Sequence, residues 1–276
     1  MCHNENMKIE ITNINKGVWQ ILKAEKDWWF AGICSTIIFG FIIYYFGARN
    51  LYWFFSPLLV FGLRFGIIAG RVRKDFWQQF AASQGFGYKE TSNIEHESAL
   101  FFAEGESPTI DHVIEGTIEG RKMRVFEYSF YGSGKSKRTH EYTVFAFQFD
   151  GAFPHLYLDQ IKNSYGIGVR GERIPVPHDF EKDFTLYGPR KYEVEALAIF
   201  TPQVFAALLD EEWPHDIELV KQELLIFRDT SIRTSKELED ELERDLALMR
   251  LLAPALDRAT LTQIGDYPHS LRRDSS

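Results

Sequence analysis

Cysteine is scarce in this 276-residue chain, and basic residues are outnumbered by acidic ones. The two cysteines, Cys2 and Cys34, cannot form a disulfide framework, which excludes a disulfide-stabilised secreted module. With 31 Lys and Arg against 39 Asp and Glu, the net charge is -8, and no basic cluster is dense enough to neutralise a row of phosphates. We therefore expect no nucleic-acid partner. The hydrophobic fraction of 45% excludes an intrinsically disordered chain.

Recognisable catalytic motifs are also lacking. The eight histidines form no His-x-x-x-His or His-Glu-x-x-His pair, no pair of cysteines accompanies them, and no Gly-x-Ser-x-Gly segment occurs. We therefore predict no catalytic, cofactor-binding or metal site and no cofactor. One alternative stays open: Asp111-His112 and His140-Glu141 would resemble a general acid–base pair if their strands were neighbours.

Charge is distributed unevenly along the chain. Residues 1–74 carry a net charge of +5, whereas residues 75–276 carry a net charge of -13. A basic first quarter followed by an acidic remainder predicts two regions that lie in different environments.

The first apolar segment, Trp28–Ala48, contains no charged residue. Its 21 residues would extend about 31 Å as a helix, enough to cross a hydrocarbon core of about 30 Å. Trp28 and Trp29 stand at one end and tyrosines near the other, where an aromatic belt would place them. A soluble core helix of this length normally has a polar stripe, so the pattern favours a transmembrane helix.

A second apolar segment covers Asn50–Gly70 and is interrupted by Pro57 and Arg64. Proline is tolerated in membrane helices, and an arginine near the end of a span can extend its side chain to the headgroups. We interpret the segment as a second span. A re-entrant or interfacial segment is the alternative.

Positive charge lies outside both ends of this pair of segments. Four lysines precede Trp28, and Arg71, Arg73 and Lys74 follow Gly70. A short link between the spans implies an antiparallel helical hairpin, and the positive-inside rule then places both termini in the cytoplasm. The sequence therefore predicts an integral inner-membrane protein whose first span is not a cleaved signal peptide.

Strand-like periodicity dominates the remainder of the chain. We expect a hairpin around the turn Glu119–Gly120, further strands near 140–149, 155–159 and 184–187, and a last hairpin over 216–228. Thr201-Pro202 is typical of a helix start, and Thr234 to Glu237 form a capping box that opens a long helix. That helix has one apolar stripe, consisting of Leu238, Leu242, Leu246 and Met249.

The predicted fold class is α+β: an N-terminal two-helix transmembrane hairpin followed by a cytoplasmic antiparallel β-sheet domain with a long C-terminal helix. The predicted organisation is a cytoplasmic N-terminal segment (1–27), the hairpin (28–70), an amphipathic stalk helix (71–89), the α+β domain (90–259) and a flexible tail (260–276).

One stretch, residues 179–210, resembles a known sequence pattern. An uncharacterised bacterial family of two-span, membrane-anchored proteins, which shares a domain of unknown function, has a Phe-x-x-x-Phe-x-Val-Tyr segment, then Glu-Ala, then an apolar pair before Thr-Pro. The matching positions here are Phe180, Phe184, Leu186, Tyr187, Glu195, Ala196, Ile199, Phe200, Thr201 and Pro202. Leu186 replaces the family's Val and Phe200 its Leu. The resemblance implies the architecture of two spans and a sheet domain, and it implies no activity.

The sequence favours a non-enzymatic binding or scaffolding role over an enzymatic one. The expected partners are the lipid bilayer and an unidentified protein. Lys135, Lys137 and Arg138, in a loop between strands, are candidates for contact with anionic headgroups. The acidic run Glu237–Glu243 with Arg244 is interpreted as the solvated face of the last helix. The alternative function is a membrane-tethered enzyme whose site is assembled from dispersed residues such as His112 and His140.

Overall fold

The computed structural model describes residues 10–24, 27–46, 56–93, 99–103, 105–132, 138–163 and 171–259. For residues 24, 27–31, 33, 39, 42, 43, 46 and 56–61 the description covers the backbone alone. The chain divides into two compact units. The first unit comprises the chain up to Ser83 together with Arg233–Lys236, and the second comprises Gln84–Ile232 and the chain from Glu237 onward. The predicted tail 260–276, Lys135 and Lys137 lie outside the described residues.

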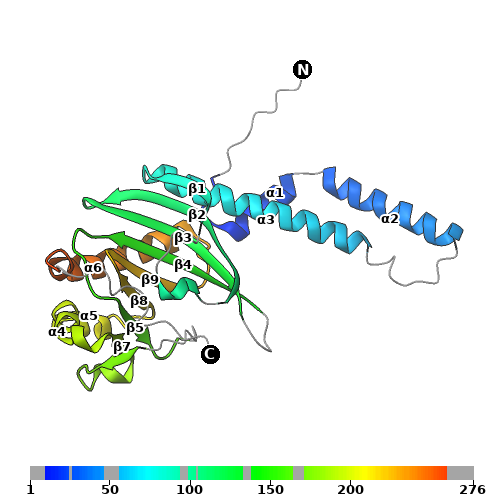
Figure 1. The fold of residues 1–276 in the computed structure, drawn as a ribbon. Helices are drawn as coiled ribbons and strands as arrows, with labels where there is room; N and C mark the ends of the chain where they lie inside the picture. The colour runs from blue at the N-terminus through cyan, green and yellow to red at the C-terminus, as the bar shows by residue number, and fades with distance from the viewer. Residues whose placement is uncertain are drawn as a thin grey trace. The chain divides into compact units, whose positions relative to one another are not determined.

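The described part of the chain contains both helices and strands (Figure 1). The helices are α1 (Ile14–Ala24), α2 (Asp27–Phe46), α3 (Ser56–Ser83), α4 (Glu193–Ile199), α5 (Pro202–Asp210) and α6 (Ser235–Leu256), with short 3₁₀ helices η3 (Leu100–Ala103), η4 (Phe180–Lys182) and η5 (Arg190–Tyr192). The strands are β1 (Gly87–Ser92), β2 (Glu106–Ile118), β3 (Arg121–Tyr131), β4 (Thr139–Gln148), β5 (Leu156–Gln160), β6 (Glu172–Ile174), β7 (Phe184–Gly188), β8 (Asp216–Val220) and β9 (Glu223–Asp229).

These strands form one nine-stranded sheet in the order β1-β2-β3-β4-β9-β8-β5-β7-β6. Every pairing between neighbours in that order is antiparallel. The fold of the second unit is therefore α+β with a large antiparallel sheet and a long C-terminal helix, as the sequence predicts. The two edge strands β1 and β6 were not expected, because their short polar sequences show no clear period of two.

Two local predictions are confirmed in detail. Glu119 and Gly120 both have positive φ, 51° and 80°, as a two-residue type I′ turn between β2 and β3 requires. Thr201 caps α5, because its Oγ1 accepts a hydrogen bond of 3.4 Å from the backbone N–H of Val204, and Pro202 follows where a missing donor is harmless.

An aromatic cluster forms the core on one face of the sheet. Phe101 of η3 lies at its centre, with its ring stacked 4.1 Å from that of Phe227 and edge-on at 4.7 Å to that of Tyr142. Tyr128 lies 5.4 Å away on β3. All four side chains are at most 1% exposed. The side chain of Phe101, which comes from η3, therefore covers residues of β3, β4 and β9 together.

The first unit is built on α3. Helix α1 packs against it where Gly17 allows a close approach, since a Cβ at that position would lie 2.9 Å from Val72 Cγ1. The backbone N–H of Ile11 donates to Gln79 Oε1 at 2.8 Å. Pro57 falls in the first turn of α3, where a missing N–H donor is tolerated, so it does not interrupt the helix as its place within the apolar segment suggests.

Helix α3 also replaces part of the predicted stalk. The expected helix from Arg71 is present as the last part of α3, which ends at Ser83; Gly85 follows with φ of 72°, and β1 begins at Gly87, so only the last residues of the segment 71–89 are not helical. When only residues with described side chains are counted, which leaves out part of α2 and the start of α3, no single helix combines the length and the apolar character of a membrane span. Residues Arg190–Ile199 and Pro202–Asp210, bent by 66°, together satisfy that criterion by length and composition only.

Gly105 provides a test of the packing between η3 and β3. Its φ is 76°, and a Cβ there would lie 2.1 Å from Phe130 Cδ2 and 2.7 Å from the carbonyl oxygen of Tyr131. We expect Gly105→Ala to lower the free energy of unfolding by about 3 kcal/mol, combining backbone strain with overpacking. Gly120→Ala is the matched control, because φ is also positive there but no atom lies within 4 Å, and it should cost about 1 kcal/mol. Equal losses in urea unfolding would contradict the predicted clash.

Candidate functional site

Strand β8 carries polar residues to both faces of the sheet. Side chains alternate along a strand, so Asp216 and Glu218 share one face and His215 points to the other. All three are at most 5% exposed. A buried carboxylate is costly unless donors surround it, so the partners of these residues define the polar centre of the domain.

Glu218 links β8 to the aromatic cluster. Its Oε1 lies 2.6 Å from His155 Nε2 and accepts the backbone N–H of Leu100 at 2.5 Å, and its Oε2 accepts that of Phe101 at 3.2 Å. The carboxylate thereby holds the first residues of η3 over the sheet. His155 Nδ1 has no hydrogen-bond partner within the described part of the chain. The arrangement acts as a structural anchor for η3.

Asp216 anchors the end of β5. Its Oδ2 accepts the Tyr157 hydroxyl at 2.5 Å, and its Oδ1 accepts the backbone N–H of Gln160 at 2.8 Å and Asn163 Nδ2 at 2.5 Å. Burial raises the pKa of Asp216 to about 7, although the three hydrogen bonds oppose this rise. Burial, and then the adjacent carboxylate of Asp216, also raise the pKa of Tyr157 well above its ordinary value. Asp216 is therefore a group that titrates near neutral pH inside the core.

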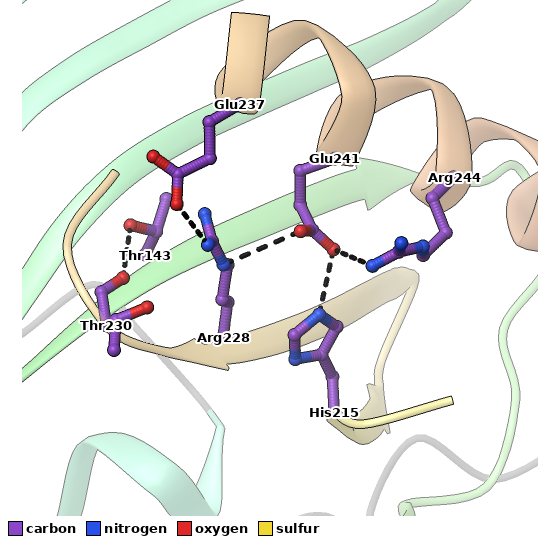
Figure 2. A network of polar contacts seen from close by, with 7 residues as sticks. All are labelled: Thr143, His215, Arg228, Thr230, Glu237, Glu241 and Arg244. Atoms are coloured by element: carbon purple, nitrogen blue, oxygen red, sulfur yellow. Dashed lines mark hydrogen bonds and ion pairs between the residues drawn. The ribbon is translucent and has the colours of Figure 1, made fainter. Parts of the chain in front are cut away.

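A second network lies on the opposite face, between β8, β9 and α6 (Figure 2). Glu241 Oε1 lies 2.8 Å from His215 Nε2 and 3.3 Å from Arg244 Nη1. Arg228 places its Nη2 2.5 Å from Glu237 Oε1 and its Nε 3.5 Å from Glu241 Oε2. The predicted solvated face of the acidic run is thus wrong at Glu241, which is 6% exposed and faces the sheet.

Charges in this second network affect the acids of α6 in opposite ways. Burial raises the pKa of Glu241, but the hydrogen bond from His215 and the positive charges around it outweigh burial, so that pKa lies below the ordinary value. Asp245, one turn further along α6, is fully buried, and burial followed by the charge of Glu241 raises its pKa well above the ordinary value. Neither Asp245 oxygen, nor Arg228 Nη1, has a hydrogen-bond partner among the described residues.

The dispersed histidine pair is not brought together. His112 lies on β2 and His140 on β4, and β3 runs between them, which separates the two backbones by about 10 Å. His112 Nδ1 is 2.8 Å from the Tyr88 hydroxyl, whereas the His140 ring stacks 5.1 Å from that of Phe130. The condition that their strands be neighbours is therefore not met.

Two surface pockets of about 400 Å³ each occur in the described part of the second unit. The first is lined mainly by small residues of the loop at Ala152, helix α4 and the end of α6, together with Glu195 and Arg258. The second contains Lys162, which pairs with Asp183, and the buried Trp213. Their linings do not place a nucleophile beside a base, so neither forms a recognisable catalytic arrangement.

Sequence reasoning missed both polar networks for a physical reason. Asp216 and Glu218 alternate with Ile217 and Leu219, which is the ordinary pattern of a strand with one solvated face. Only the cover provided by η3, whose bonded residues precede Glu218 by 118 and 117 positions, makes that face internal. For the second network, the capping-box residue Glu237 was a partial sequence signal, because a carboxylate at the start of a helix can bind a cation such as Arg228.

The raised pKa of Asp216 predicts that unfolding free energy depends on pH. The pKa of Asp216 is about 7 in the folded protein and near 3.8 in the unfolded chain, so the folded protein binds this proton more tightly. Proton binding therefore stabilises the folded state fully below about pH 4, and this stabilisation is lost as pH rises through 7. The asparagine of Asp216→Asn cannot ionise. In urea unfolding of the full chain in detergent, this variant should therefore lose up to about 4 kcal/mol of the pH-dependent change in unfolding free energy. Asp210→Asn, on the exposed end of α5, is the control. Identical pH profiles for wild type and Asp216→Asn would contradict the assignment.

Arg228 is expected to matter more than Arg244, although both contact Glu241. Arg228 is 14% exposed and Arg244 42% exposed. Arg228→Met leaves two carboxylates without their buried cation and should cost about 3 kcal/mol, whereas Arg244→Met should cost about 1 kcal/mol or less. Thermal and urea unfolding of the two variants measures the difference, and a larger loss for Arg244→Met would reverse the interpretation.

Comparison with known proteins leaves the chemistry of the site open. No protein-family model matches the chain, and no curated protein matches it. Among solved structures, the chain is similar to the mycobacterial trehalose monomycolate transport factor A, TtfA, with a TM-score of 0.47 and 14% sequence identity. That match covers 68% of this chain and 96% of the other. We draw no functional conclusion from a similarity of this degree.

Proposed function

We propose that this protein is an inner-membrane-anchored binding or scaffolding module. In this proposal residues 28–70 form a transmembrane hairpin, both termini are cytoplasmic, and the sheet domain engages a protein partner there. The observation that carries the proposal is a row of large apolar side chains that α2 exposes. We also propose membership of the two-span family that residues 179–210 resemble.

The exposed side chains of α2 need an apolar surrounding. Among the residues of α2 with described side chains, five large apolar ones are 58–85% exposed: Ile37, Ile38, Phe41, Tyr44 and Tyr45. Exposing such area to water costs about 25 cal/mol per Å², and soluble monomers rarely expose contiguous apolar patches. A 20-residue helix extends about 30 Å, which fits the hydrocarbon thickness. The absence of charge from Trp28 to Ala48 supports the same environment.

Helix α3 supports the second half of the hairpin. Leu63, Phe65 and Ile67 are 39–63% exposed, and Arg71, Arg73 and Lys74 follow within two turns. An apolar surface that gives way to basic residues is typical of the cytoplasmic end of a span. In this proposal the exposed Arg64 extends its side chain to the headgroups.

A binding role is favoured over catalysis because the buried carboxylates hold structural elements in place. Glu218 and Asp216 are satisfied by bonds that hold η3 and the end of β5, and Glu241 holds α6 to the sheet. The alternative enzyme, with a site including His112 and His140, has less support because β3 separates the two residues. Contact of Lys135, Lys137 and Arg138 with anionic headgroups remains part of the proposal, and Arg138 is exposed.

Membrane extraction tests the anchor. Wild-type protein should stay in the membrane pellet after alkaline carbonate treatment. Ile38→Lys combined with Phe41→Lys should release it, because each lysine at the centre of a span costs about 2.5–3.5 kcal/mol. Val194→Lys, at a residue of α4 that is 78% exposed, is the matched control and should leave the protein in the pellet. Wild-type protein found in the carbonate supernatant would overturn the proposed function.

A further inference from the structure

Helix α1 has two faces of different character. One face packs within the first unit: Val18 and Leu22 are 5% and 3% exposed, and Gly17 lies against Val72 of α3. The helix is well defined at its start, where Asn13 Oδ1 accepts the backbone N–H of Lys16 at 3.0 Å. Its apolar side is therefore already occupied, and the other side is free to meet a partner.

The opposite face combines positive charge with an exposed indole. Lys16, Trp19, Gln20 and Lys23 follow the three- and four-residue spacing of one helical face, and all four are exposed. Trp19 is 60% exposed. No acidic residue occurs between Ile14 and Ala24, so nothing within the helix neutralises the two lysines. A tryptophan flanked by lysines is the composition found at membrane–water interfaces.

The position of α1 matches the headgroup level of the proposed hairpin. Gly17 meets α3 at Val72, and that residue lies between Arg71 and Arg73. Helix α1 therefore runs beside the basic band that ends the second apolar segment. It also ends at Ala24, only three residues before α2 begins at Asp27.

We propose that the Lys16–Trp19–Lys23 face of α1 binds the anionic headgroup layer of the cytoplasmic leaflet. This inference rests on the proposed membrane anchor. The two ammonium groups interact with lipid phosphates, and the indole inserts at the depth of the ester carbonyls. Charge complementarity favours anionic lipid as the binding partner, because this face of α1 has two cations and no anion and the inner leaflet is negatively charged.

Contact with lipid at α1 would reach the segment that leads into α6. The backbone N–H of Ile14 donates to the carbonyl oxygen of Arg233 at 2.9 Å, and that of Ser235 donates to Thr12 at 3.0 Å. Asn13 and Thr234 form an antiparallel bridge between these two bonds. The first residue of the helix that has the lipid-binding face is thus hydrogen-bonded to Arg233, two residues before α6 begins.

Spin labelling of the full chain in vesicles tests the inference. In a Cys2→Ser, Cys34→Ser background, Gln20→Cys places a label on the α1 face and Ile38→Cys places one on α2. Vesicles of phosphatidylcholine, with and without phosphatidylglycerol, supply the neutral and anionic surfaces. With phosphatidylglycerol, collisions of the position-20 label with oxygen should rise and those with a water-soluble nickel chelate should fall.

Removing the two lysines should abolish this response. Lys16→Gln with Lys23→Gln should lower the ratio of docked to undocked label about 25-fold in anionic vesicles, at roughly five-fold for each lysine. Lys89→Gln with Lys122→Gln, two exposed lysines of the sheet domain, makes the same change in net charge and should leave the ratio unchanged.

The two labels separate failure of the anchor from failure of this inference. A position-38 label that the nickel chelate reaches as readily as in water would overturn the membrane anchor. A position-38 label in lipid with a position-20 label that stays in water in both vesicles would overturn the α1 inference alone. A position-20 label shielded from both reagents would mean that a protein surface covers α1, and it would also overturn the inference.

Discussion

The burial of carboxylates at the centre of the sheet is the constraint on which the domain depends. A carboxylate removed from water must be surrounded by donors or must take up a proton. Glu218 meets this requirement with His155 and the backbone N–H groups of η3, and η3 in turn brings Phe101 onto the sheet. The polar anchor and the aromatic core are therefore one assembly, because neither is complete without η3.

The same constraint is met differently on the other face. There Arg228 of β9 binds two acids of α6, so the helix is held by charge as well as by its leucine stripe. Asp245 has no hydrogen-bond partner among the described residues, and burial, followed by the charge of Glu241, raises its pKa well above the ordinary value. In some proteins buried ionic groups select one packing arrangement while adding little net stability. We infer that they define the position of α6 along the sheet.

The proposed membrane anchor and the α1 surface are linked by one close contact. Gly17 allows α1 to lie directly beside the basic band of α3, so lysines distant in sequence from Arg71 come to the same level. Ile14, the first residue of α1, donates its backbone N–H to the carbonyl oxygen of Arg233, and Ser235, the first residue of α6, donates its backbone N–H to that of Thr12.

The sequence by itself determined the local elements whose signals are local. The Glu119–Gly120 turn, the Thr201-Pro202 start of α5, the last hairpin and α6 all follow from residues within a few positions of one another. The same holds for the α+β class. Tertiary structure alone decided which polar residues are internal, because burial of Asp216, Glu218 and Glu241 depends on contacts with segments far away in the chain. Periodicity reports which side of a strand a residue occupies, but it cannot report what later covers that side.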